Sequence, residues 1–171
     1  MMAGDRSQGA LANLSGRVFE RMMEPVFEAN GFPVLTEREF RAHPERYGGL
    51  GRYILRDAVY TTIYGHEGRT EFVIVDGERR IRVEAKFQSA PGSVDEKFPY
   101  MMLNGIYRYP EDEVVFVVDG GGYRAGARAW LEDRIDGDWL RYREEHGKRM
   151  RLMSITEFMD WFNHGLPAEV E

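Results

Sequence analysis

The rest of the sequence is arranged around the stretch from Arg69 to Gln88, which reads RTEFVIVDGERRIRVEAKFQ. Two runs rich in apolar and β-branched residues flank Asp76-Gly77, a dipeptide typical of the turn in a β-hairpin. In the second run apolar and polar residues alternate, which is the period of two expected for a half-buried strand. The stretch therefore predicts two antiparallel strands with one apolar face and one polar face.

The polar face of this hairpin brings two acids close together. With a two-residue turn, Glu71 lies opposite Arg82 and diagonal to Glu84, whereas a four-residue loop puts Glu71 directly opposite Glu84. Any loop of even length places Glu71, Glu84 and Lys86 on one face, and a loop of odd length separates them. Neighbours on one face have Cβ atoms roughly 4.5–8 Å apart. The two carboxylates would therefore repel each other unless a proton or a cation lay between them.

Two interpretations of this face are open. In the first, the paired carboxylates bind a hard divalent metal ion. In the second, the face is a solvated surface on which Arg80, Arg82 and Lys86 neutralise the acids. The spacing of the residues does not decide between them.

Composition limits the class of protein. The chain has 171 residues, of which 43% are hydrophobic and 30% charged, as is usual for a globular protein with one core. We expect a single domain over residues 1–171, with flexible tails over 1–10 and 165–171. There are no cysteines, which excludes disulfides and thiolate zinc sites and fits an intracellular, cytoplasmic setting.

Charge and hydropathy limit the partners. No apolar run approaches the ~20 residues that cross a bilayer, so we expect no membrane partner. The net charge of −6 argues against a protein that coats nucleic acid through its overall charge. A local basic patch on an enzyme is still compatible with this charge.

Periodicity and turn residues predict the order α-β-β-β-α-β-α-β-α. Because strands and helices alternate in this way, we expect an α/β fold with a mixed sheet flanked by helices. Pro25 predicts a kink or a break in the first helix. The expected helices cover residues 11–32, 37–42, 93–105, 125–135, 139–146 and 155–163, and the expected strands cover 52–64, the two arms of the hairpin, 113–118 and 151–154.

Several motifs together resemble the PD-(D/E)XK nuclease superfamily. They are GRVFE at residues 16–20 of a helix, GFPV at 31–34, an acid on one hairpin strand, and Glu84-Ala-Lys86 on the next. The resemblance implies a restriction-endonuclease-like fold, similar to that of Holliday-junction resolvases and phage-borne nucleases. Its core order αβββαβ matches residues 11–118, and the rest of the chain would form a C-terminal α/β extension of the sheet.

The resemblance assigns roles to individual residues. Glu71 stands where the family has the Asp of its Pro-Asp pair, and Glu84 and Lys86 stand for the Glu and Lys of the second motif. Glu20 matches a helix acid found in some members, and Gln88 a polar residue two positions after the lysine. The first motif departs from the family pattern, because it reads Thr-Glu rather than Pro-Asp.

These roles imply a divalent-metal-dependent nuclease. The carboxylates of Glu71 and Glu84 and the carbonyl of Ala85 would offer oxygen ligands to Mg²⁺ or Mn²⁺. Lys86 would orient or deprotonate the attacking water, and Gln88 would bind that water or the phosphate.

The expected substrate is DNA, cut by an endonuclease, with RNA also open. A homodimer would let two sites cut two strands. The alternative is an inactive nuclease-fold protein that acts as a nucleic-acid-binding or protein-binding accessory factor. Four cations are candidates for binding the phosphate backbone: Arg80, Arg82, Lys97 and Arg124.

Other motifs have simpler interpretations. Glu20 lies in a charged run that favours ion pairing on a helix surface, and Asp57 favours a turn over a third catalytic acid. The run DGGGY at 119–123 favours a strand-to-helix turn over a phosphate cradle, because it lacks the lysine of a P-loop. The four histidines show no spacing typical of metal ligands.

Overall fold

The computed structural model describes residues 6–167, with side chains from residue 17 onward. Its centre is a six-stranded mixed sheet made of β1 (Val34–Thr36), β2 (Arg52–Thr61), β3 (Glu67–Asp76), β4 (Arg79–Phe87), β5 (Glu113–Asp119) and β6 (Arg149–Met153). The strands lie side by side in sequence order. β2, β3 and β4 form an antiparallel meander, β1 runs parallel to β2, and β5 and β6 continue parallel to β4.

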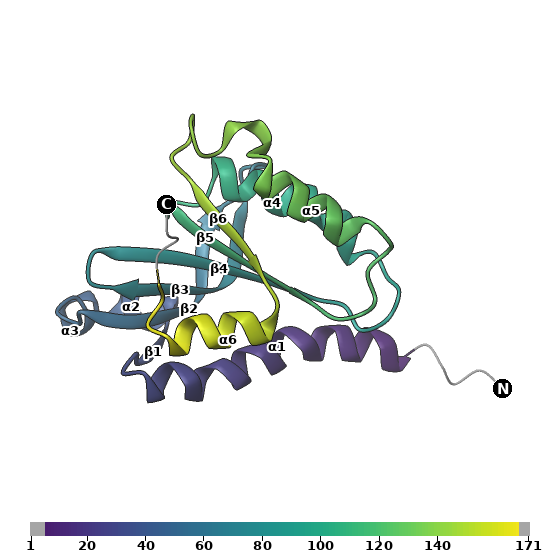
Figure 1. The fold of residues 1–171 in the computed structure, drawn as a ribbon. Helices are drawn as coiled ribbons and strands as arrows, with labels where there is room; N and C mark the ends of the chain where they lie inside the picture. Colours follow the sequence, from purple (N-terminus) through teal and green to yellow (C-terminus); the bar gives the residue numbers. More distant parts are fainter. Residues whose placement is uncertain (1–5, 168–171) are drawn as a thin grey trace.

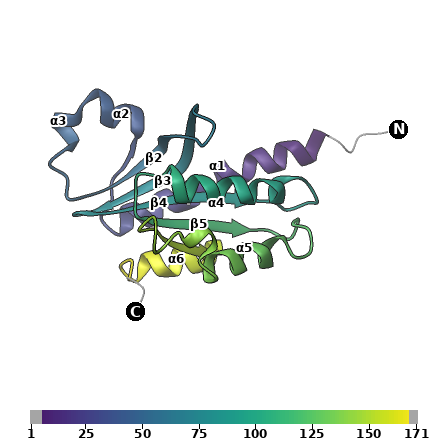
Figure 2. The same ribbon diagram turned by 90° about the horizontal axis from the view of Figure 1, so that it is seen from above.

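Helices cover both faces of the sheet. α1 (Arg6–Ala29) and α6 (Ile155–Asn163) lie along one face, and α4 (Phe98–Tyr107) and α5 (Ala127–Asp136) lie along the other (Figure 1, Figure 2). The shorter elements are α2 (Glu37–Ala42), α3 (Pro44–Tyr47) and the 3-10 turns η1 (Val94–Lys97) and η2 (Trp139–Arg141). Among residues 6–167, no helix is both long and apolar enough to cross a lipid bilayer.

Each face of the sheet has its own apolar core. Between the sheet and α1 and α6, the ring of Phe27 lies 5.0 Å from that of Phe72 and 4.8 Å from that of Phe162. β5 is buried on both sides, since Val115 and Val117 face this core and its other apolar residues face α4 and α5. The continuous apolar run of β5 thus reflects its central place in the molecule.

The predicted mixed sheet and the core order αβββαβ are confirmed, and two local predictions are wrong. Of the kink or break predicted at Pro25, the break is absent: α1 runs through Pro25 as one continuous element, because its stripe of buried residues, including Phe19 and Met23, outweighs the one hydrogen bond that proline removes. Ser93 makes no capping hydrogen bond, and its φ of −110° and ψ of 14° differ from the extended backbone of a capping serine. The expected helix over 139–146 is reduced to the 3-10 turn η2.

Part of each expected tail lies within the described residues. Residues 6–10 belong to α1. Leu166 is only 2% exposed, and Trp161 Nε1 donates a hydrogen bond to the Pro167 carbonyl at 2.9 Å, so residues 165–167 are held against the α6 face. Residues 1–5 and 168–171 lie outside the described residues.

The turn of the central hairpin lies one residue later than expected. Asp76 pairs with Arg79, so the two-residue turn is Gly77-Glu78. Gly77 adopts φ +62°, a conformation that glycine enters at little cost and that a tight hairpin turn requires at this position. The loop length is therefore even, as the juxtaposition of the two acids requires.

Candidate active site

The two acids meet where β3 and β4 separate. The last registered pair of the two strands is Phe72 with Val83. One step further, the register brings Glu71 opposite Glu84. There the backbone ladder stops, and Glu71 Oε2 accepts a hydrogen bond from the Ala85 N–H at 2.6 Å. A carboxylate side chain thus takes the place of a backbone acceptor on the neighbouring strand.

The pairing of β2 with β3 is irregular at the level of Glu71, beside the point where β3 and β4 separate. Leu55 and Ala58 pack in the same apolar cluster although they are three residues apart, so the strand carries one extra residue between them. Asp57 lies in that gap with φ +56°, a strained conformation for a non-glycine residue. Glu71 lies directly across from Asp57, and the ladder between β2 and β3 skips this pair.

Lys86 completes a compact charged cluster with the two acids. Its ammonium donates hydrogen bonds to Glu84 Oε1 and to the Ala85 carbonyl, the latter at 3.0 Å. Glu84 is only 7% exposed. The structure thus brings together Glu71, Glu84, Ala85 and Lys86. The first three are the predicted metal ligands, and Lys86 is the predicted catalytic lysine.

Burial makes the charges of this cluster interdependent. Burial, followed by the neighbouring Glu84 charge, raises the pKa of Glu71 to about 7. For Lys86, burial alone would lower the pKa, but the Glu84 and Glu71 carboxylates outweigh burial and raise it. The lysine is thus held as an ammonium, and Glu71 retains its proton more readily than an isolated glutamate would.

The donor set fits a hard divalent cation. Two carboxylates and one carbonyl oxygen are ligands that Mg²⁺ and Mn²⁺ prefer, and waters complete their coordination. The Lys86 ammonium bonds two of these three groups, Glu84 and the Ala85 carbonyl, which indicates that the site favours positive charge. Within residues 17–167 there is no cluster of three or more His, Cys, Asp or Glu side chains that could hold a metal, so the protein supplies only two carboxylates.

Two tyrosines form one wall of the site. Tyr109 donates a hydrogen bond to Glu84 Oε2 at 3.3 Å, and its ring packs edge-on against Tyr60 at 4.7 Å. Burial, with a further contribution from the Glu84 charge, raises the pKa of Tyr60 to about 12 and also raises that of Tyr109. Both phenols are therefore kept as donors beside the carboxylate.

Arg82, which was predicted to bind the phosphate backbone, is buried and is not available to nucleic acid. It is 2% exposed, and its guanidinium makes two hydrogen bonds to Glu111, at 2.5 and 3.1 Å, and one of 3.0 Å each to Thr70 Oγ1 and the Ala58 carbonyl. A buried guanidinium must be fully paired, and these partners use its donors. Its plane also lies 5.2 Å from the Tyr109 ring centroid, so Arg82 supports the tyrosine that contacts Glu84.

Gln88 bonds to backbone groups of nearby loops and does not face an open site, where it was predicted to bind the water or the phosphate. Its Nε2 donates to the Gly122 carbonyl at 2.7 Å, and its Oε1 accepts from the Val94 N–H at 2.9 Å. A Cβ on Gly120 would lie 2.3 Å from the Gln88 carbonyl, which explains the glycine at this close approach. The run at 119–123 is thus a turn packed on the end of β4, and its Gly122 N–H is bonded to the Gln88 carbonyl.

Glu20 lies apart from the cluster. It lines a pocket of about 490 Å³ between α1 and β2 with Asp57 and Arg56, and Arg56 is ion-paired to Glu24 at 2.6 Å. Burial, followed by the charge of Asp57, raises the pKa of Glu20. The structure therefore groups Glu20 with Asp57, on the α1 side of the irregularity.

The remaining cations fall in different places. Lys97 is exposed and lines a pocket with Glu84 and Lys86, as a phosphate-binding residue should. Arg124 is ion-paired with Glu96 at 3.1 Å in the loop before α5. Arg80 is exposed but lies at the turn end of the hairpin, four residues or about 13 Å along the strand from Glu84.

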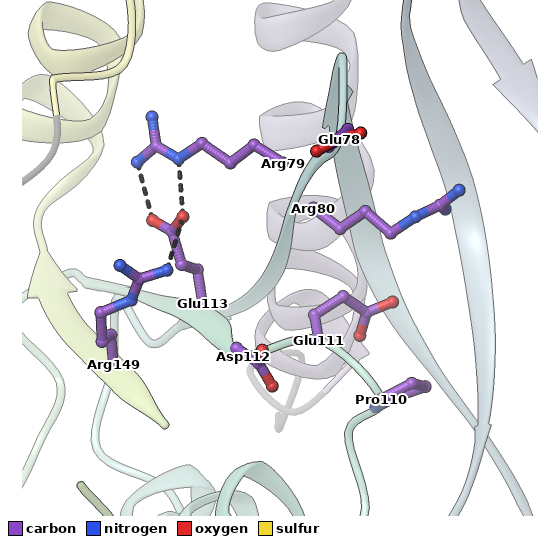
Figure 3. Close-up of a pocket in the computed structure, with 8 residues that line it drawn as sticks. All are labelled: Glu78, Arg79, Arg80, Pro110, Glu111, Asp112, Glu113 and Arg149. Atoms are coloured by element: carbon purple, nitrogen blue, oxygen red, sulfur yellow. Dashed lines mark hydrogen bonds and ion pairs between the residues drawn. The ribbon is translucent and has the colours of Figure 1, made fainter. Parts of the chain in front are cut away.

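The turn end of the hairpin carries its own charged pocket, of about 520 Å³. Arg79 and Arg149 converge on Glu113, while Arg80 points to the other side of the strand (Figure 3). Burial alone would raise the pKa of Glu113, but the two arginines lower it. Glu113 is thus neutralised by guanidinium groups, unlike the carboxylate pair of the Glu71–Glu84 cluster.

The fold agrees with the comparison with protein-family models. The model of the PD-(D/E)XK nuclease superfamily domain matches residues 11–166. The chain belongs to this superfamily. The mixed sheet flanked by helices is consistent with its restriction-endonuclease-like fold, and membership supports a nuclease-type function on a nucleic-acid substrate. The comparisons with curated proteins and with solved structures each find no match.

Two residues that support the candidate site, one directly and one through Arg82, could not be predicted from the sequence. Tyr109 and Glu111 follow α4 and are far in sequence from the strands they contact. The segment Tyr109-Pro-Glu111 resembles an ordinary loop, and nothing in its local pattern links it to Glu84 or Arg82. Only the parallel return of β5 beside β4 brings it to the site.

Proposed function

We propose that this protein is a divalent-metal-dependent deoxyribonuclease that hydrolyses internal phosphodiester bonds. The observation that carries the proposal is the convergence of Glu71, Glu84 and Lys86 where β3 and β4 separate. A carboxylate pair in which burial opposes charge is costly to maintain in a fold, and binding of a cation relieves that cost. The superfamily membership supports the same conclusion.

Each residue has a stated role in the proposal. Glu71, Glu84 and the Ala85 carbonyl would hold Mg²⁺ or Mn²⁺. Such an ion, when bound, polarises the scissile phosphate and lowers the pKa of a water. Lys86 would orient the attacking water and offset negative charge developing on the phosphate. Tyr109 would hold Glu84 in position through its hydrogen bond, and Lys97 would bind the phosphate backbone.

The test is cleavage of branched, duplex and single-stranded DNA in Mg²⁺ and in Mn²⁺. We expect Glu84→Ala and Lys86→Ala to lose at least 100-fold in rate, because electrostatic groups at such sites commonly contribute about that much. The matched control is Glu78→Ala, which changes an exposed acid at the turn end of the same hairpin. Cleavage that survives both site substitutions would reject the proposal.

A second candidate is an inactive nuclease fold that serves as a binding factor. Two observations favour it: residues 17–167 contain no three-residue metal cluster, and the Lys86 ammonium bonds two of the expected metal ligands. Calorimetry with Mg²⁺ and Mn²⁺ separates the candidates. Metal binding that is lost in Glu84→Ala supports the enzyme, and absence of binding in the unmodified protein supports the binding factor.

A further inference from the structure

An aromatic surface adjoins the carboxylate cluster. A pocket of about 280 Å³ is lined by Glu84 and Lys86, and its walls include Tyr100 and Tyr109. Beside this pocket, the ring of Tyr64 stacks on that of Tyr100, with centroids 5.2 Å apart and planes inclined by 25°. Tyr64 is 74% exposed, the largest exposed fraction among the exposed large hydrophobic side chains of the described residues. A large flat ring thus stands in solvent next to the cluster.

The position of this ring is fixed by buried hydrogen bonds. Tyr64 lies in the turn between β2 and β3, and Tyr100 lies in α4. Asn104, which is fully buried, joins the two: its Oδ1 accepts from the Ile63 N–H at 2.9 Å, and its Nδ2 donates to the Tyr100 carbonyl at 2.9 Å. An exposed ring on a fixed backbone loses little entropy when it binds a ligand, which is the advantage of a preorganised contact.

Cations lie on the same pocket. Lys97 and Arg69 both line it and both are exposed, and Arg69 makes only a surface ion pair with Glu67. Exposed aromatic rings beside cations are the combination that binds single strands, because bases stack on the rings while the cations neutralise phosphates. In a duplex the bases are already stacked and paired, so only a flipped or unpaired base reaches such a ring.

We propose that Tyr64 and Tyr100 form a stacking platform for an unpaired nucleobase, so that single-stranded nucleic acid, or a single-stranded segment of a larger substrate, is bound beside Glu84 and Lys86. The inference rests on the proposed nuclease function, since Tyr100, on which Tyr64 stacks, lines one pocket with Glu84 and Lys86. It deepens that function by naming the class of substrate.

The experiment measures binding without cleavage. Fluorescence anisotropy in EDTA compares a labelled oligothymidine, an oligouridine of the same length and a duplex of the same length. For single strands we expect Tyr64→Ala to weaken binding by roughly 5- to 150-fold, the range for loss of one stacked base. Tyr64→Phe retains the ring and is expected to bind like the unmodified protein.

The matched control is Tyr107→Ala. Tyr107 is also an exposed tyrosine, at 49%, but its ring packs against His146, which does not line the pocket, whereas Tyr64 stacks on Tyr100, which does. Binding of either DNA or RNA that depends on Tyr64 and not on Tyr107 supports the platform, and the stronger of the two arms identifies the substrate. Equal affinity for duplex and single strand, or Tyr64→Ala binding as tightly as the unmodified protein, would overturn it.

Failure of the platform and failure of the nuclease are distinguishable. If Lys86→Ala abolishes cleavage while Tyr64→Ala leaves single-strand binding unchanged, the nuclease stands and the platform is rejected. If single strands bind through Tyr64 but no substrate is cleaved in Mg²⁺ or Mn²⁺, the platform stands and the nuclease is rejected.

Discussion

Glu71 carries the residue-scale conflict between burial and charge. Its carboxylate accepts the Ala85 N–H, which stabilises the ionised form, yet burial and the nearby Glu84 charge raise its pKa to about 7. A group that must be ionised to bind a metal is thus partly protonated near neutral pH in the free protein. This conflict gives the site a measurable signature in stability.

We predict that the metal-free protein loses stability as the pH rises from about 4.5 to about 7. The folded state keeps the Glu71 proton up to the raised pKa, whereas the unfolded chain releases it near the ordinary value of 4.5. Between these values the unfolded state binds fewer protons, so the free energy of unfolding falls with rising pH. Urea unfolding in EDTA at several pH values measures the slope.

Glu71→Gln should flatten this slope, because the amide does not titrate. The matched control is Glu67→Gln, an exposed acid on the same strand, which should leave the slope unchanged. A slope that persists in Glu71→Gln would assign the titration to another group.

Arg82 shows why single residues of the site were hard to assign from the sequence. An arginine on the polar face of a strand is normally solvated, and the pattern of β4 gives no sign that α4 and the loop after it cover this residue. Its partner Glu111 comes from that loop. Glu84 and Lys86 were predictable because their positions follow from the alternation of one strand and a recognisable motif, both of which are local.

At the scale of elements, two helices begin with the same capping motif but differ in how much of the core they bury. Thr36 begins α2 and Ser154 begins α6, and each forms a complete capping box with a glutamate three residues later. α2 has no buried residue, whereas α6 buries Phe158, Trp161 and Phe162. The same motif is therefore tied to very different amounts of packing.

We predict that Ser154→Ala lowers the free energy of unfolding by about 1 kcal/mol, the usual cost of losing a capping side chain. Thr36→Ala should cost less, because α2 has no buried residue of its own and meets the core through Phe40, which stacks on Tyr53. Urea unfolding of the two variants measures both. An equal or larger loss in Thr36→Ala would contradict the idea that packing, rather than the cap itself, transmits the effect to the whole fold.

The hairpin shows how far the sequence predicts an element. Its two strands, its even loop length and its polar face follow from alternation and a turn signal. The irregularity at Asp57 and Glu71 does not, because it lies where the pairing of β2 with β3 skips one pair of residues. Register across two strands is a tertiary property. The sequence therefore predicted which acids meet and missed the local backbone that brings them together.

At the scale of the whole molecule, one sheet is shared by two cores. β5 contributes alternate residues to both, so neither core can lose its packing while the other keeps a complete sheet. The C-terminal residues tie in as well, since Arg79 at the hairpin turn donates to the Leu166 carbonyl. We therefore expect the two faces to unfold together.

The three tryptophans make this expectation measurable. Trp161 reports on the α6 face, and Trp130 and Trp139, whose rings lie 5.3 Å apart, report on the α5 face. In Trp161→Phe the fluorescence comes from the Trp130–Trp139 pair, and in the double variant Trp130→Phe/Trp139→Phe it comes from Trp161. We predict that, in urea unfolding of each variant, the fluorescence and the far-UV circular dichroism change at the same midpoint. Within either variant, fluorescence and dichroism midpoints that differ would show that the faces unfold separately.

Adding Leu166→Ala to each variant tests the coupling directly. Leu166 is 2% exposed and packs with the α1–α6 core, so its truncation should cost about 2–5 kcal/mol. Because β5 joins the cores, the Trp130–Trp139 pair on the opposite face should report the same loss as Trp161 does. A loss seen only by Trp161 would mean that the α6 face can melt on its own, and the sheet alone would then hold the Glu71–Glu84 cluster in place.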